Sequence, residues 1–565
     1  MAGVMRIRVR SRRDHRTISK RNQQRIAANP LESLDMAGSN MWALAPERTK
    51  NGNAILLGNP HQPWSREATY YEAHLIVPGI MNFYGSTFIG RPVLTSGFNE
   101  QLGWSHTVNY PDLEEIYAIP LDPDRENHFL FDGDSVPLEK QEVNVRFRDG
   151  RIVRTESRTY WHTPLGPVID RDAKNVYVLR SACYDEYRAY VQWLRMSLAK
   201  SHAQFRQALE MQAVPMFNIC YADREGNIEY LWNGTVPVLP HAARLAEAVP
   251  ATNSSQIWTR FHSLAELPQL HNPPGGYVQN CNDPFHYTNL RVPMNPNQFP
   301  LYFSPRRLGL RTQHCLELID GDEKWSLEDV RDRKFSQRML LADKVKGDLI
   351  AVLEKENPTG DLAEALQILK RWDNSVSAKS VGSVLFETWW RHYAMEGSGN
   401  LAKPIEVDSY AIPWSADQPM TTPHGLGNKN RAVAAMKTAV EDVKREQGRL
   451  DVPWGDVHRL RRGDKDLPVG GGSGFLGCFR VLSFAPAKSH RRVIEGGDSW
   501  IFAVEFANPP KAYSVLGYSQ SSNPQSPHFN DQAELFAEDR MKPVAFTDDE
   551  IQAGLLREYH PGDKE

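Results

Sequence analysis

Residues 54–60 read "AILLGNP", and three comparable runs follow in "ATYYEAHLIV" (68–77), "FYGSTFI" (83–89) and "LGWSHTVN" (102–109). Each run is short, rich in β-branched and aromatic residues, and bounded by Gly, Pro or Asn. That pattern is typical of β-strands joined by turns. We therefore expect the segment from about Ala54 to Leu121 to build a large sheet.

The pattern changes further along the chain. Segment 143–161 alternates polar and apolar residues around an Asp-Gly turn, which predicts a β-hairpin. Apolar residues then recur at helical spacing from about 325 to 447, where Ser326 and Asp329 form a capping-box pair, and strand-like runs return after Pro453. Strands, then helices, then strands favour layered sheets with a helical excursion over a repeated βαβ unit.

Composition narrows the class of protein. Hydrophobic residues make up 41% of the 565 residues, and 66 basic residues against 69 acidic residues give a formal charge of -3. This balance disfavours nucleic acid as a partner. No apolar run approaches the roughly 18 residues of a membrane helix, so we expect no membrane span. The five cysteines contain no CxxC pair, so we expect buried thiols rather than a disulfide framework or a zinc site.

Two features that would suggest other functions are set aside. The stretch "GGGSGFLG" (470–477) has the glycine spacing of a dinucleotide-binding turn, but a strand-like run follows it where a helix should begin. The 18 histidines form no HExxH motif and no Cys/His cluster along the chain. We therefore predict no cofactor and no metal ion.

The stretch "DMAGSNMWAL" (35–44) contains a Gly-Ser-Asn that would ordinarily form a turn. If the Gly38–Ser39 bond were cut, however, Ser39 would carry a free α-amino group beside its own hydroxyl. Such an amine has an ordinary pKa of about 7.7 to 8.0, which suits a general base near neutral pH. One residue would then hold both nucleophile and base, and it would need oxyanion donors and groups that orient the amine.

The chain resembles the penicillin acylase family of N-terminal nucleophile hydrolases from Gly38 almost to its C-terminus. Six motifs occur in the family's order: "GSNMWALAPERTKNGNAILLGNPHQPW", "LGWSHTVN", "VPMFNICYADREGNIEYLWNGTVPV", "QNCNDP", "LRTQHCLEL" and "GYSQSSNPQSPHFNDQAELF". The resemblance implies an α+β fold, a four-layer αββα sandwich with a helical insertion, and a hydrolase of linear amide carbon–nitrogen bonds. It also implies autocatalytic cleavage between Gly38 and Ser39, which makes residues 39–565 the catalytic β chain.

The resemblance assigns roles to five residues. Ser39 matches the nucleophile, and its freed amine matches the base. His61 in "NPHQPW" matches a residue that contacts the nucleophile, for which a structural histidine is the alternative. Val108 matches the backbone N–H donor of the oxyanion hole, and Asn282 matches its side-chain amide donor. Arg311 matches the arginine that orients the amine and the asparagine.

Substrate choice is less well defined by the sequence. Met216 and Phe217 match positions that line an acyl pocket, and Gln62 lies where related lactone acylases often have an aromatic residue. The histidine at position 61 favours acyl-homoserine lactones or lipopeptides as substrates. The acyl side chain of a β-lactam is the third candidate substrate.

Some neighbouring residues compete for these assignments. Asn280 lies close to the proposed amide donor, and Arg306 and Arg307 lie close to the proposed arginine. Asp112 and Glu115 lie near positions that bind calcium in some family members. We expect these two acids to be solvated surface groups and predict no metal there.

The resemblance also implies a partner. Family precursors carry a signal peptide and an α chain before the cleavage point, whereas the Arg-rich segment 1–38 precedes it here. We expect this segment to be a disordered leader or linker remnant, and the α chain to be a missing partner. The resemblance implies a periplasmic or extracellular location. The sequence shows no apolar stretch of the kind that a signal peptide contains, so the cytoplasm is the alternative location. The alternative is an uncleaved, non-catalytic relative that serves as a binding or scaffold protein.

Overall fold

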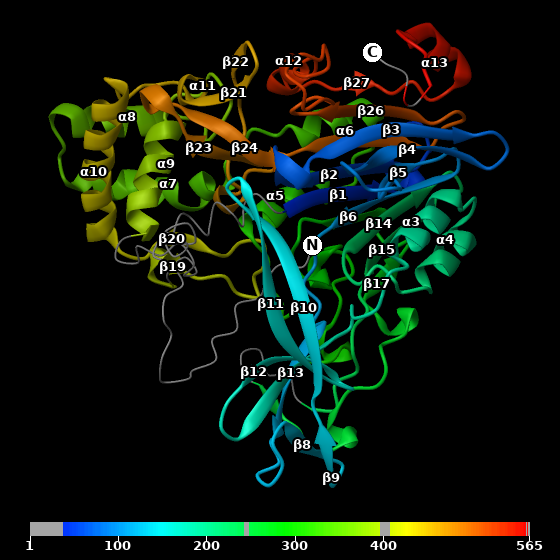
Figure 1. Ribbon diagram of the computed structural model, residues 1–565. Helices are drawn as coiled ribbons and strands as arrows, with labels where there is room; N and C mark the ends of the chain where they lie inside the picture. The colour runs from blue at the N-terminus through cyan, green and yellow to red at the C-terminus, as the bar shows by residue number, and fades with distance from the viewer. Residues whose placement is uncertain (1–37, 242–247, 396–406, 561, 563–565) are drawn as a thin grey trace.

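The computed structural model describes residues 38–241, 248–395, 407–560 and 562. The predicted leader therefore lies outside the described residues, except for Gly38, which begins strand β1 and is buried. The chain forms a mixed α+β structure with several sheets, as expected from the order of strand and helix signals (Figure 1). The order of four layers stays a prediction.

The first strand lies inside a ten-stranded sheet. β1 pairs antiparallel with β2 on one side and with β18 on the other, and every residue of β1 is buried. The strands of this sheet are β1 (Gly38–Leu44), β2 (Ile55–Pro63), β18 (Tyr277–Asn280), β21 (His458–Arg462), β22 (Lys465–Pro468), β23 (Leu482–Pro486), β24 (Arg492–Asp498), β25 (Trp500–Glu505), β26 (Lys511–Leu516) and β27 (Lys542–Pro543).

A seven-stranded sheet packs against the first, because β1 and β2 contact β6 and β14. The approach is close at Gly58 of β2, where a Cβ atom would lie 2.1 Å from the Phe502 ring and 2.6 Å from Ser105 Oγ. Glycine is therefore needed at this crossing. The strands are β3 (Tyr70–Val77), β4 (Met81–Phe88), β5 (Ser96–Phe98), β6 (Leu102–Thr107), β14 (Asn218–Asp223), β15 (Ile228–Trp232) and β17 (Gln269–His271).

The predicted hairpin at 143–161 is confirmed, and it is part of a longer ribbon. β10 and β11 pair from Glu139↔His162 to Asp149↔Ile152 and extend along the molecule (Figure 1). Their sheet contains β7 (Glu114–Pro120), β10 (Glu139–Asp149), β11 (Ile152–Thr163), β12 (Gly166–Arg171), β13 (Asn175–Ser181) and β16 (Val249–Pro250). Two small pairs complete the strands: β8 (His128–Phe131) with β9 (Asp134–Pro137), and β19 (Tyr410–Ile412) with β20 (His424–Leu426).

Helices α7 to α10 enclose a second hydrophobic core, in which Leu366, Leu369, Trp372 and Trp389 are buried. The capping box of Ser326 with Asp329 is confirmed at the start of α6. The helices are α3 (Ala189–Leu198), α4 (His202–Leu209), α5 (Leu310–Ile319), α6 (Leu327–Lys334), α7 (Leu340–Lys355), α8 (Gly360–Arg371), α9 (Ser383–Met395), α10 (Lys429–Gln447), α11 (Trp454–Val457), α12 (Ala533–Ala537) and α13 (Asp548–Gly554).

The structure bears on three further expectations. The glycine stretch forms one 3-10 turn at Gly474–Leu476 that leads to β23, so no helix opens there for a nucleotide phosphate. None of the five cysteines, all of which the structure describes, forms a disulfide, but Cys183 is exposed, so the expectation that all are buried was wrong. Among the described residues, no helix combines the length and the apolar character needed to cross a membrane.

A fully buried ion pair joins α6 to the ten-stranded sheet. Lys334 Nζ lies 2.7 Å from Asp498 Oδ2, and neither side chain is exposed. Burial lowers the pKa of Lys334, while the lysine and a neighbouring histidine hold the pKa of Asp498 at about 2 in spite of its burial. The low pKa of Asp498 keeps its carboxylate charged at neutral pH, and the carboxylate and Lys334 depend on each other because water does not solvate them.

Lys334→Ala should lower the free energy of unfolding by about 3 to 5 kcal/mol, because it leaves the Asp498 carboxylate buried without its cation. Lys50→Ala is a matched control, since Lys50 Nζ also lies 2.7 Å from an aspartate, Asp329, in a pair whose side chains are 55% and 37% exposed. We expect that loss to stay below about 1 kcal/mol. Urea unfolding followed by tryptophan fluorescence compares the two, and equal losses would contradict the role given to burial.

Candidate active site

Ser39 is held on all sides by side chains from other elements. It is the second residue of β1 and is 3% exposed. Its N–H donates to Asn282 Oδ1 at 2.6 Å, and its carbonyl accepts from Arg311 Nη1 at 2.6 Å. Its hydroxyl donates to the carbonyl oxygen of Gly38, which places Oγ beside the peptide bond that joins the two residues.

Asn282 connects Ser39 to the end of β6. It follows β18 and has a φ of 70°, a left-handed conformation that Asn adopts more readily than most residues. Its Nδ2 donates to the carbonyl of Val108 at 2.9 Å, and its Oδ1 accepts from Ser39 and from Arg311 Nη2 at 2.9 Å. The side-chain amide is therefore fixed in one orientation, with its N–H₂ group beside Val108.

Asn280 supports this turn and does not contact Ser39. Its Oδ1 accepts from the N–H of Asn282 at 2.8 Å and from Thr107 Oγ1 at 2.5 Å, and Asn218 Nδ2 donates to the same oxygen at 3.0 Å. Thr107 and Asn218 belong to the seven-stranded sheet, whereas Asn280 ends β18 in the ten-stranded sheet. This buried network links the two sheets directly behind the turn that carries Asn282.

Arg311, in the first turn of α5, supplies the fixed positive charge of the site. Besides its contacts with Ser39 and Asn282, its Nη1 donates to Asn40 Oδ1 at 2.7 Å. Arg306 and Arg307, the neighbours that could compete for the assignment, are not among the donors to these three residues. The sequence analysis missed Asn40, although it lies directly after the nucleophile candidate in "GSN".

Gly38 lies in a space that admits little more than hydrogen. A Cβ atom on it would lie 3.1 Å from His61 Nδ1, 3.2 Å from Asn282 Oδ1 and 3.3 Å from Arg311 Nη2. These distances are tighter than ordinary van der Waals contact, so any larger residue would push against the groups that surround Ser39. A larger residue before the serine would therefore have to displace these three side chains by a few tenths of an ångström.

His61 faces Gly38 across the β1–β2 ladder and is 1% exposed. Its Nε2 lies 3.0 Å from Asn59 Oδ1 and 3.1 Å from Asp498 Oδ1. Because both neighbours are oxygen acceptors, Nε2 carries the proton of the neutral ring and Nδ1 keeps its lone pair. Burial lowers the pKa of His61 to about 4, against the opposing effect of Asp498, so the ring is neutral near pH 7.

Of the residues predicted to bind substrate, Phe217 lies beside the end of β6, and Gln62 belongs to β2. Val108 follows β6, and the next residue, Asn109, accepts the N–H of Phe217 at 2.7 Å, so the ends of β6 and β14 lie together. Phe217 has a φ of 104° and is half-buried, as is Met216. Gln62 directly follows His61 in β2, so its side chain points to the opposite face of the strand.

Glu115 differs from the expectation of a solvated surface acid, whereas Asp112 is half-buried. Glu115 is 5% exposed, and burial raises its pKa to about 7. Burial also raises the pKa of Asp112, whose charge further disfavours ionisation of Glu115. The expectation was wrong because β7, which carries Glu115, lies inside its sheet between β13 and β16.

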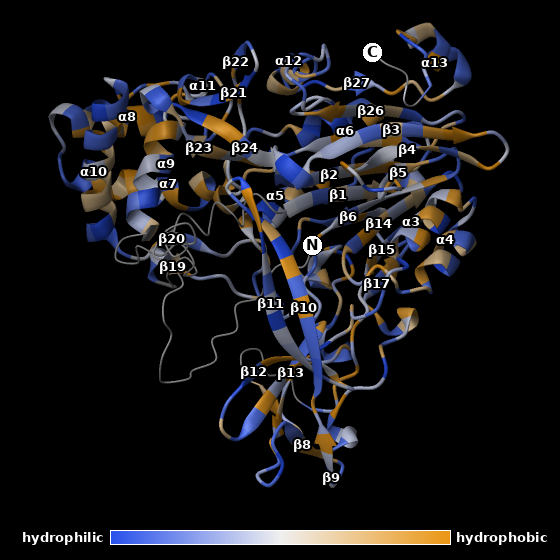
Figure 2. Cartoon of the chain, viewed as in Figure 1, coloured by the Kyte–Doolittle hydropathy of each residue, from blue (hydrophilic) through white to orange (hydrophobic). Residues whose placement is uncertain are grey.

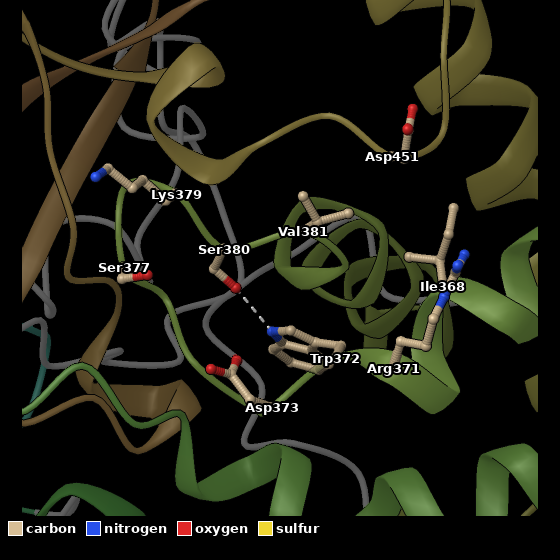
Figure 3. Close-up of a pocket in the computed structure, with 9 residues that line it drawn as sticks. All are labelled: Ile368, Arg371, Trp372, Asp373, Ser377, Lys379, Ser380, Val381 and Asp451. Carbon is tan, nitrogen blue, oxygen red and sulfur yellow. Dashed lines mark hydrogen bonds between the residues drawn. The ribbon is translucent and has the colours of Figure 1, made fainter.

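A hollow of about 570 Å³ lies in the helical part of the chain and does not belong to this site. Trp372 forms part of its wall and donates to Ser380 Oγ at 2.9 Å (Figure 3). None of the residues around Ser39 lines it; the lining residues are Ile368, Arg371, Trp372, Asp373, Ser377, Lys379, Ser380, Val381 and Asp451.

Comparison with known proteins gives concordant results. The sequence model of the family described as penicillin amidase matches residues 2–553. The acyl-homoserine lactone acylase PvdQ of Pseudomonas fluorescens Pf-5 is 28% identical over 96% of this chain and 72% of that protein. The aculeacin-A acylase of Actinoplanes utahensis is 27% identical over 91% of this chain and 69% of that protein.

One solved structure shows the similarity of fold. A thermostable penicillin G acylase from Alcaligenes faecalis superposes with a TM-score of 0.66 at 19% identity, and the match covers 93% of this chain and 100% of that chain. At this identity the comparison supports the fold alone.

The neutral, buried state of His61 predicts a pH dependence of stability. The unfolded chain, whose histidine has a pKa of about 6.5, binds more protons than the folded chain between pH 6.5 and 4, so the free energy of unfolding falls as the pH falls through this range. The difference is about 2 kcal/mol between pH 7 and pH 5. His61→Gln should shrink the loss of stability between these two pH values, measured by urea unfolding, by that amount. An unchanged loss would show that His61 is not neutral in the folded protein.

Proposed function

Because this chain belongs to the penicillin amidase family, we propose that it is an acyl-amide hydrolase whose nucleophile is Ser39, exposed as a new N-terminus by cleavage of the Gly38–Ser39 bond. The observation that carries the proposal is the position of Ser39: its hydroxyl contacts the Gly38 carbonyl, while Asn282 and Arg311 hold its N–H and its carbonyl. An ordinary turn serine needs none of these contacts.

The proposed self-cleavage uses the groups around Gly38. Ser39 Oγ attacks the carbonyl carbon of Gly38, the new carbon–oxygen bond replaces the carbon–nitrogen bond, and the hydroxyl proton passes to the departing nitrogen. Nδ1 of His61, which faces Gly38 with a lone pair, is placed to assist this proton transfer. Water then hydrolyses the ester and releases the Gly38 carboxylate and the Ser39 amine.

Substrate turnover would repeat the same chemistry on an acyl amide. The Ser39 amine, acting through water, takes the hydroxyl proton as Oγ attacks the substrate carbonyl, and the Val108 N–H and the Asn282 amide stabilise the oxyanion. The amine product leaves with the proton, and water hydrolyses the acyl-enzyme. The guanidinium of Arg311 lies close to the nitrogen of Ser39, so it would disfavour protonation of the amine and lower its pKa.

For the substrate we propose an acyl-homoserine lactone, with a lipopeptide as the next candidate. Two relatives that cover most of this chain are named for these activities, an acyl-homoserine lactone acylase and an aculeacin-A acylase. Both substrates present an acyl group on an amide nitrogen. Phe217 and Met216, half-buried at the end of β14 nearest Val108, are proposed to contact the acyl group.

We further propose that the protein functions in the periplasm or outside the cell.

A second chain of the processed enzyme is proposed to cover the β3–β4 hairpin. β3 is the edge of the seven-stranded sheet, and its end turns into β4 through an apolar loop (Figure 2). The side chain of Ile80, in the loop between β3 and β4, is 62% exposed. An apolar edge strand of this kind favours pairing with another chain.

Intact-mass spectrometry of the purified protein tests self-cleavage. We expect a species that begins at Ser39, and we expect Ser39→Ala and Gly38→Val to abolish it, the first by removing the nucleophile and the second by crowding His61 and Asn282. Gly321→Val is the matched control, because a Cβ atom there meets nothing within 4 Å. A full-length mass for the unsubstituted protein would contradict the proposal and favour the uncleaved binding or scaffold protein.

The rate of acyl-homoserine lactone hydrolysis tests the oxyanion donor. Asn282→Ala should lower kcat by on the order of 10² to 10³, because one of two donors to the oxyanion is lost. The assay uses the fraction of each variant whose mass begins at Ser39. Asn357→Ala is the control, since Asn357 is exposed and also has a left-handed φ, of 46°. A kcat for Asn282→Ala equal to that of the control would exclude Asn282 as a donor.

A further inference from the structure

Two histidines and one glutamate meet at the edge of the seven-stranded sheet, away from Ser39. Among the residues that the structure describes, His202, Glu229 and His271 bring one ligand atom each to within 4.8 Å of one another. The three residues are far apart in the sequence, so no sequence motif predicts the cluster. Glu229 is buried, His202 is half-buried and His271 is exposed, which leaves the cluster open to solvent on one side.

The fold fixes the three side chains on separate elements. Glu229 of β15 pairs directly with His271 of the edge strand β17, so their side chains lie on the same face of the sheet. His202 is the first residue of α4, after Ser201, whose side chain caps that helix. The rings of His202 and His271 stack at a centroid distance of 4.7 Å and an interplanar angle of 20°.

The Glu229 carboxylate is held by hydrogen bonds from neighbouring side chains, as carboxylates that bind metal ions usually are. Glu229 Oε2 lies 2.7 Å from His202 Nε2, and Glu229 Oε1 accepts from Arg206 Nη1 at 2.6 Å. Arg206 thereby orients the carboxylate and leaves Oε2 directed at His202, which is the arrangement of an outer partner that positions a ligand. An ordinary ion pair of Glu229 with Arg206 and His202 would not require the second imidazole.

The donor set selects a class of ion. Two imidazoles and one carboxylate suit Zn²⁺ and similar divalent transition metals, whereas Ca²⁺ and Mg²⁺ prefer sites made of oxygen ligands. His271 Nε2 lies 3.1 Å from Asn272 Nδ2, so a metal ion would either replace this hydrogen bond or bind at Nδ1. Zn²⁺ coordinates such ligands at about 2.0 to 2.2 Å, so the three ligand atoms would have to move closer together and the stacked rings of His202 and His271 would have to turn toward the ion.

We propose that His202, Glu229 and His271 bind one divalent transition-metal ion of the zinc class. The ion joins α4 to β15 and β17, and so fastens the edge of the sheet whose inner strands β6 and β14 lead to Val108 and Phe217. Three protein ligands leave a fourth position for water. The site uses none of the residues assigned to amide hydrolysis. The proposal of a metal site therefore does not depend on the proposed hydrolase function.

Calorimetric titration of the chelator-treated full chain with ZnCl₂ tests the site. The titrations use Cys183→Ser protein, because the exposed Cys183 thiol could also bind zinc. We expect one Zn²⁺ per chain and a higher melting temperature when Zn²⁺ is present. His271→Ala should weaken binding by more than about 100-fold, a larger effect than the loss of an outer partner, and should abolish the thermal shift.

His528→Ala is the matched control, because His528 is an exposed histidine that also pairs with a carboxylate, Asp531, at 2.8 Å. It should bind Zn²⁺ like the parent protein. His271→Ala tests the site without disturbing the core, and its melting temperature without metal confirms that it folds. Failure of the parent to bind Zn²⁺ would overturn the proposal. So would equal affinity in His271→Ala and His528→Ala.

Discussion

The hydrogen bonds that converge on Asn282 Oδ1 are the constraint on which the site depends. This one oxygen accepts from the backbone of β1 at Ser39 and from the guanidinium of Arg311 in α5, while the same amide donates to the end of β6. Three elements from distant parts of the chain are thus held against one side chain. Asn282 itself is fixed by its left-handed backbone and by Asn280, which is bound to the other sheet.

Burial determines the charge states of the groups that lie next to the site. Asp498 lies between Lys334 and His61, and the three groups are shielded from water. The lysine keeps the aspartate charged, Asp498 Oδ1 lies 3.1 Å from Nε2 of the histidine, and burial keeps the histidine neutral. The consequence is a fixed tautomer in which the lone pair is on Nδ1, the ring nitrogen near Gly38. A structural ion pair and the chemistry proposed at Ser39 are therefore coupled through one residue.

The same sheet supports two kinds of polar cluster. At the inner end of β6 and β14, Thr107 and Asn218 form a fully satisfied network around Asn280. At the outer edge, Glu229 is shared between Arg206 and His202, with His271 beside them. Buried networks specify one arrangement because an unpaired member costs more than a paired one contributes. The edge cluster is partly open, and a metal ion would complete it.

The sequence by itself determined the features that depend on neighbours along the chain. Strand runs, the hairpin at 143–161, the capping box at Ser326 and the Gly-Ser pair at the proposed cleavage point are all local patterns, and the ordered motifs pointed to the family. Only the tertiary structure decided which residues surround Ser39 and which groups are buried. Asp498 next to His61, the buried Glu115, the exposed Cys183 and the cluster at Glu229 had no sequence signal, because their partners lie far away along the chain. Desolvation and hydrogen bonding act through space, so they became visible only once the sheets had packed.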